Sequence, residues 1–210
     1  MLAEHLPLTT DRLRPMKRRR IKLTGPLRRR RAAGAAGVLL AILLALAAAI
    51  ERLADRGSDW NRYDHQTFPV VHVVDGDTIR IRDATNEVPV RLIGIDAPEL
   101  PDAHWATEAR DYVQARTLGR AVTLRLEPTQ TRDRYGRLLA YVYLSDSDCL
   151  NLDLIRDGQA YADRRFRHSY RPQYEMTENE ARRKGRGLWK DVTEAQMPQW
   201  RRQWLKQRQR

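Results

Sequence analysis

The sequence predicts a β+α fold, in which a five-stranded OB-type β-barrel is closed by about three helices and preceded by one transmembrane helix. Three observations carry this prediction. Five short segments between residues 70 and 144 have the alternating or β-branched pattern of strands, a helix-like segment interrupts them after the third, and an uncharged run of nineteen residues precedes them all. Five short strands with a helix inserted after the third are typical of an OB-type barrel.

The N-terminal part predicts a membrane anchor. Residues 1–31 carry eleven Lys or Arg against two acidic residues, and the Leu- and Ala-rich run at 32–50 follows. As a helix this run would be about 28 Å long, close to the roughly 30 Å hydrocarbon core of a bilayer. The preceding positive charge places the N-terminus in the cytoplasm. We therefore expect a single-pass membrane protein with an extracytoplasmic domain.

A cleaved signal peptide is the alternative interpretation of the same run. Ala45-Leu46-Ala47 offers the small-x-small pattern of a cleavage site, although the basic segment before it is long for a signal peptide. The chain would then be secreted. Both interpretations export the domain that follows.

Residues 51–68 are polar and lack a clear period, which predicts a linker. A globular domain is predicted at 69–190, because strand patterns begin directly after Pro69. The five predicted strands are Val70–Val74, Ile79–Arg82, Val88–Leu92, Val122–Glu127 and Leu138–Leu144.

Three helices are predicted around the barrel. The first lies between the third and fourth strands, behind Asp102 as a possible N-cap, and has apolar residues at helical spacing: Trp105, Ala109, Tyr112 and Val113. The second contains Leu150, Leu154 and Ile155, with Gly158 just beyond it. The third covers Tyr174 to Lys184.

The C-terminal residues 191–210 form a basic tail, in which Trp200, Trp204 and Leu205 lie among five Lys or Arg. A solvated tail is the default expectation, and contact with nucleic acid or anionic lipid is the alternative. The formal net charge of +12 comes from the two ends, because residues 32–181 sum to −5. Overall basicity is therefore no evidence that the central domain binds nucleic acid.

Two acidic segments lie at predicted strand ends. Asp75-Gly76-Asp77-Thr78 separates the first two strands, and Ile95-Asp96-Ala97-Pro98-Glu99 follows the third. Each alone is compatible with an ordinary turn or strand exit. Together they offer three or four carboxylates, which is the oxygen-rich set that a hard cation requires.

Two arginines accompany these carboxylates. Arg91 precedes Asp96 by five residues, and an ideal strand would place the two on opposite faces. A bulge at Gly94, or a strand that ends before Asp96, would bring them to one site, and the sequence leaves both possibilities open. Arg137 closes the segment Asp133–Arg137, which is otherwise read as a hairpin turn with exposed charges.

In order and spacing, three motifs resemble the staphylococcal nuclease family: Val74–Thr78, Val90–Glu99 and Asp133–Tyr141. The resemblance covers about Pro69 to Trp189 and includes the closing Gly187-Leu188-Trp189. It departs at two positions. Ala97 stands where the family pattern has Thr, and Arg164 stands where it has a nucleotide-contacting Tyr, a role that Tyr161 or Tyr170 could take over.

The resemblance implies a calcium-dependent nuclease that hydrolyses phosphodiester bonds of DNA or RNA, with nucleic acid as its partner. It implies that Asp77, Asp96 and the backbone carbonyl of Ala97 hold Ca²⁺, while Arg91 and Arg137 bind the phosphate and Glu99 accepts a proton from water or orients it. Arg134 and Tyr135 would contact the substrate.

The alternative is a catalytically silent OB-type module that binds nucleic acid or protein and is tethered to a membrane. Such a module would have lost carboxylates or arginines that this chain retains. The five histidines show no paired ligand spacing and Cys149 is the single cysteine, so neither zinc chemistry nor an intrachain disulfide is predicted. No further cofactor and no protein partner are predicted.

Overall fold

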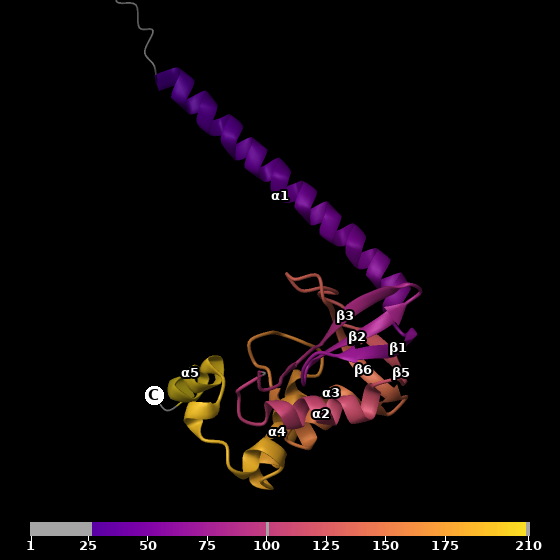
Figure 1. The fold of residues 1–210 in the computed structure, drawn as a ribbon. Helices are drawn as coiled ribbons and strands as arrows, with labels where there is room; N and C mark the ends of the chain where they lie inside the picture. The colour runs from indigo at the N-terminus through magenta and orange to yellow at the C-terminus, as the bar shows by residue number, and fades with distance from the viewer. Residues whose placement is uncertain (1–26, 100, 209–210) are drawn as a thin grey trace, which may run out of the picture. The chain divides into compact units, whose positions relative to one another are not determined.

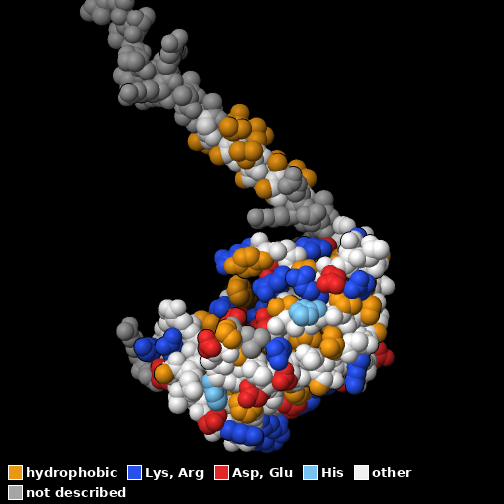
Figure 2. Space-filling view, in the orientation of Figure 1, with side chains coloured by type: hydrophobic (Ala, Val, Ile, Leu, Met, Phe, Trp, Pro, Cys, Tyr) orange, Lys and Arg blue, Asp and Glu red, His pale blue; other side chains and the backbone are white. Residues whose placement is uncertain are grey.

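The computed structural model of this protein describes residues 27–99 and 101–208, with side chains at 37–50, 57–99 and 101–208. The chain divides into two compact units between Ala48 and Ala49. The helix α1 (Leu27–Tyr63) contains residues of both. Figure 2 shows hydrophobic side chains along α1, and those of Val38 to Leu46 are more than half exposed where they are large and apolar.

The transmembrane helix predicted at residues 32–50 lies inside α1. Across the part of the chain that the structure describes, no helix has the length and apolar character needed to cross a membrane. The predicted span is therefore not confirmed.

Five strands form the predicted barrel, and this part of the fold is confirmed (Figure 1). They are β1 (Thr67–Val73), β2 (Thr78–Asp83), β3 (Asn86–Leu92), β5 (Ala121–Leu126) and β6 (Leu138–Ser145). Neighbours pair antiparallel in the order β3-β2-β1-β5-β6, and the parallel pairing of β3 with β6 closes the ring. A short strand β7 (Asp148–Cys149) pairs antiparallel with the end of β6.

Alternation along the strands fills the barrel. Ile79 and Ile81 of β2 are fully buried, as are Val90 and Leu92 of β3 and Leu124 of β5. Because side chains alternate between the two faces of a strand, every second residue reaches the interior. The apolar period of two in the sequence is therefore the direct cause of the barrel core.

Three helices cover the barrel where helical patterns predict them: α2 (Ala106–Thr117), α3 (Leu150–Arg156) and α4 (Arg171–Arg183). The predicted N-cap of the first is wrong. Trp105, in a left-handed conformation with φ of 71°, caps α2 instead of Asp102, and its side chain forms no capping hydrogen bond. Its indole N–H donates to Gln159 at 2.8 Å, which ties the start of α2 to the loop after α3.

The predicted linker at 51–68 is helical through Tyr63, so this assignment is wrong. Near the end of α1, Asp59 accepts two hydrogen bonds from Arg132, both at 2.7 Å, and Tyr63 is buried in the core. These two contacts explain why a polar segment without a clear period is ordered: its few buried side chains meet partners from the barrel. The domain therefore begins before residue 69.

The prediction that the basic C-terminal residues form a solvated tail is also wrong. After α4 come two short 3₁₀ helices, η1 (Gly187–Lys190) and η2 (Glu194–Gln196), and then the helix α5 (Gln199–Arg208). Arg201 of α5 is fully buried and donates to Glu178 of α4 at 2.7 and 3.0 Å. A buried charge persists only with a well-aligned partner, and this bidentate pair supplies it.

Candidate functional site

Gly94 brings the arginine and carboxylate motifs together. Strand β3 ends at Leu92, Gly94 adopts a φ of 78°, and the short strand β4 (Ile95–Asp96) pairs with β8 (Tyr161–Ala162). A Cβ at Gly94 would lie 2.5 Å from the His168 ring, so both the backbone angle and the packing require glycine. Strand β3 thus ends before Asp96, so Arg91 and Asp96 do not lie on opposite faces of one continuous strand.

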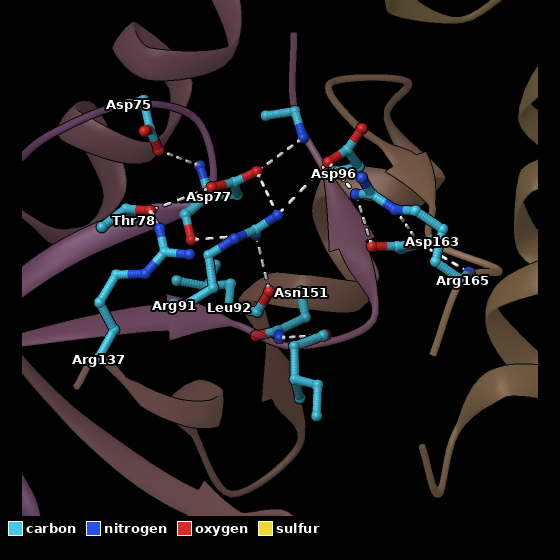
Figure 3. Close-up of polar contacts among 12 residues, drawn as sticks. Asp75, Asp77, Thr78, Arg91, Leu92, Asp96, Arg137, Asn151, Asp163 and Arg165 are labelled. Carbon is cyan, nitrogen blue, oxygen red and sulfur yellow. Dashed lines mark hydrogen bonds and ion pairs between the residues drawn. The ribbon is translucent and has the colours of Figure 1, made fainter. Parts of the chain in front are cut away.

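Asp77 lies at the centre of the site, directly before β2, and is only 5% exposed. Its Oδ2 accepts a hydrogen bond from the Ala97 N–H at 2.9 Å and contacts the Arg91 guanidinium at 2.8 Å (Figure 3). Asp75 shapes the turn by accepting from the Asp77 N–H at 2.9 Å. The two acidic motifs are therefore joined directly, through Asp77 and Ala97.

Burial raises the pKa of Asp77 to about 7, with the neighbouring charges of Asp75 and Asp96 acting in the same direction. The Arg91 guanidinium and the Ala97 N–H oppose this rise in pKa. The ionised carboxylate is thus under-compensated by the protein. A bound cation would supply the missing positive charge.

Asp96 is 7% exposed and has three donors around its carboxylate. Its Oδ1 lies 2.6 Å from Arg165 and 3.5 Å from Arg91, and its Oδ2 accepts from the Trp200 indole N–H at 2.8 Å. Arg165 and Trp200 were not among the predicted site residues. Trp200 stood out only as an aromatic residue in a basic tail, and neither residue carries a local signal that indicates its partner.

Arg137 joins the same network from the turn before β6. Its Nε donates to Asp133 at 2.7 Å, and its Nη1 lies 3.4 Å from the Thr78 hydroxyl, which donates to Asp77 at 3.1 Å. Figure 3 shows both arginines directed at the Asp77–Thr78 segment. The structure therefore gathers Asp77, Arg91, Asp96 and Arg137 in one network of contacts.

Glu99, Arg134 and Tyr135 lie at the edge of this network. Glu99 is exposed and lines a cavity of about 490 Å³ together with Asp96, Ala97 and residues of α5. Tyr135 is 66% exposed, and the Arg134 guanidinium lies 4.7 Å from the centre of its ring. Among the described residues, no contact ties these three side chains to the carboxylates of Asp77 and Asp96.

Arg164 does not replace the missing Tyr as a substrate contact. Its side chain is 6% exposed, pairs with Glu178 at 3.1 Å, and lies over the Trp204 ring at 3.9 Å. Tyr161 lines the cavity although it is nearly fully buried. Arg164 therefore belongs to the packing of α5.

The oxygen donors of the site are few. Among the side chains that the structure describes, at 37–50, 57–99 and 101–208, no three His, Cys, Asp or Glu come close enough to hold an ion together, so the predicted set of three or four carboxylates reduces to two. Asp77 and Asp96 share the same Arg91 nitrogen as a neighbour. Two carboxylates, a backbone carbonyl and water are oxygen ligands of the kind that calcium takes. The residues fit a partly hydrated hard cation.

Comparisons with known proteins agree with this arrangement. Residues 89–191 match the family model described as staphylococcal nuclease homologue. An Escherichia coli protein named uncharacterized endonuclease is 38% identical over 125 residues, which cover 59% of this chain and 76% of that protein. Staphylococcus hyicus thermonuclease is 28% identical over 163 residues, covering 73% and 95%. Shigella flexneri micrococcal nuclease is 33% identical over 141 residues, covering 63% and 79%.

Proposed function

This chain belongs to the staphylococcal nuclease family, and from that premise we propose that it is a Ca²⁺-dependent nuclease that cuts DNA or RNA at the site around Asp77 and Asp96. Its relatives are named as nucleases and endonucleases, so the chain is a phosphodiester hydrolase. The observation that carries the proposal is the position of Arg91. Its guanidinium contacts both Asp77 and Asp96, so phosphate-binding and metal-binding groups share one network.

Asp77, Asp96 and the Ala97 carbonyl would hold the cation. Bound calcium would draw electron density from a phosphoryl oxygen and offset the charge that builds on it during attack. The raised pKa of Asp77 supports this assignment, because a carboxylate that burial disfavours as an anion gains most from a cation.

Arg91 and Arg137 would bind the phosphate. A guanidinium offers paired, charge-assisted hydrogen bonds and stays protonated at working pH. Asp133 holds the Nε of Arg137, and the remaining edge of the guanidinium points toward Thr78 (Figure 3). Groups fixed in advance lower the barrier most, because no reorganisation is needed when charge develops on the phosphate.

Glu99 would accept the proton of the attacking water or orient that water. Its carboxylate is exposed on the wall of the cavity that Asp96 and Ala97 also line. A general base must reach both solvent and the reacting centre, and this position gives access to both. Arg134 and Tyr135 would contact the nucleic acid at a position further along its backbone.

We also propose that the domain acts outside the cytoplasm, tethered through residues 32–50 or secreted after cleavage. Support comes from the uncharged run and from the basic residues that precede it.

The proposal is tested with the purified full-length chain on single-stranded DNA, double-stranded DNA and RNA, each with Ca²⁺, with Mg²⁺ and with a chelator. We expect cleavage with Ca²⁺ and none with the chelator, because the carboxylate pair needs a cation. Binding of nucleic acid without cleavage under either ion would instead support the silent binding module.

A further inference from the structure

The helix α5 lies beyond the family match, which ends at residue 191, yet it reaches the proposed site. Trp200, in its first turn, donates its indole N–H to Asp96 at 2.8 Å. The same residue lines the cavity with Glu99 and Ala97. A segment outside the matched family region therefore touches a proposed metal ligand.

Two neighbours of Trp200 fix α5 against the domain. Arg201 is fully buried against Glu178, and its guanidinium lies 4.9 Å from the centre of the Trp189 ring and 5.0 Å from that of Tyr161. Trp204 packs on the buried Arg164 one turn later. Paired charges at such depth are costly to separate, so Trp200 is presented by a rigid element.

The donors at Asp96 divide by charge. Arg165 and Arg91 approach Oδ1, and a guanidinium there competes with a cation for the same oxygen. Trp200 approaches Oδ2 with a neutral N–H. A carboxylate oxygen has two lone pairs, so Oδ2 can accept this hydrogen bond and still bind an ion. The contact from Trp200 orients Asp96 without neutralising it.

We propose that Trp200 is a positioning residue, whose indole N–H fixes the Asp96 carboxylate for the cation of the active site. The inference rests on the proposed function and deepens it, because it makes the C-terminal segment part of the metal site. Hydrogen bonds from outer partners orient metal ligands, and losing one typically weakens metal binding. If Trp200 merely covered Asp96 and blocked the ion, replacing Trp200 would strengthen Ca²⁺ binding instead of weakening it.

The test is calcium titration by calorimetry on the metal-free full-length chain, comparing wild type with Trp200→Phe and Trp204→Phe. Phenylalanine keeps one aromatic ring and removes the N–H together with the second ring of the indole, a loss that Trp204→Phe reproduces on the same helix. We expect Trp200→Phe to weaken Ca²⁺ binding by about 10-fold or more, in line with other outer-partner losses. Trp204→Phe, on the same helix, should bind as wild type does, because Trp204 packs on Arg164 and donates no hydrogen bond to Asp96.

Two further readouts separate positioning from a general structural role. The thermal midpoint of the metal-free Trp200→Phe protein should stay near that of wild type, and at saturating Ca²⁺ its KM for DNA should be unchanged. Tryptophan fluorescence should change as wild type binds Ca²⁺, and most of that change should disappear in Trp200→Phe but persist in Trp204→Phe.

Calcium binding by Trp200→Phe that equals or exceeds wild type would overturn the inference and leave the proposed function intact. A wild-type chain that binds no Ca²⁺ would overturn both, and the titration of wild type alone reveals that outcome.

Discussion

Buried carboxylates and the arginines around them define this site. Asp77 and Asp96 are almost fully buried, and each is contacted by guanidinium groups. The residue types were predictable, since carboxylates and arginines at strand ends form a recognisable chemical set. Their pairing was not, because the Arg165 and Trp200 contacts with Asp96 join residues 69 and 104 positions apart in the chain.

His168 provides a pH-dependent test at this scale. Burial lowers its pKa below 6.5, opposed by the charges of Glu127 and Asp163. Below pH 6.5 the unfolded chain therefore binds a proton that the folded protein resists, so folding stability is fully present above 6.5 and is lost as the pH falls toward the lowered folded pKa. We expect His168→Gln to be less stable than wild type throughout but to lose less stability on acidification.

Denaturant unfolding of the metal-free chain at a series of pH values between about 5 and 7 measures this loss. His72→Gln is the matched control, since His72 is exposed on β1, and it should keep the wild-type slope. Identical slopes for wild type and His168→Gln would show that another group controls acid stability.

The elements divide into those with a local signal and those without one. The five strands and three covering helices follow from alternation and helical spacing, because a barrel core selects those periods. The end of α1, through Tyr63, and the helix α5 are held in place by isolated ion pairs. These pairs join Asp59 to Arg132 and Arg201 to Glu178. A few scattered anchors in a polar segment leave no periodic pattern, so the order of these two segments could not be predicted.

The turn at Gly94 is the element that assembles the site, and substitution tests it. Gly94→Ala places a Cβ at a φ of 78° and against His168 at 2.5 Å, whereas Gly119→Ala meets the same backbone strain at a φ of 72° in open space. Backbone strain costs about 1–2 kcal/mol in both. Overpacking should cost Gly94→Ala a further ~2 kcal/mol in free energy of unfolding.

Activity should separate the two glycines further. Displacement of β4 would move Asp96 away from Arg91, so we expect Gly94→Ala to lose most of its cleavage rate while Gly119→Ala keeps the wild-type rate. Thermal unfolding and a cleavage assay on both variants check this. Equal stability losses in the two variants would mean that the His168 contact is not restrictive.

Across the whole molecule, the net charge of the chain does not locate the proposed site. The excess positive charge lies in residues 1–31 and 182–210. Not all of the C-terminal charge faces solvent, because Arg201 is buried. Net charge could not indicate the substrate. The ordered motifs pointed to a nuclease family, and relatives named as nucleases agree with that family assignment.

The most direct measurement is single-turnover cleavage of a DNA oligonucleotide by the full-length chain with Ca²⁺, comparing wild type with Arg137→Lys and Glu99→Gln. Arg183→Lys and Glu108→Gln, at exposed positions of α4 and α2, are the matched controls. The account predicts a fall of about 100-fold or more in each site variant, as lost phosphate clamping and proton transfer imply, with wild-type rates in both controls. Site variants that cut as fast as wild type would contradict it.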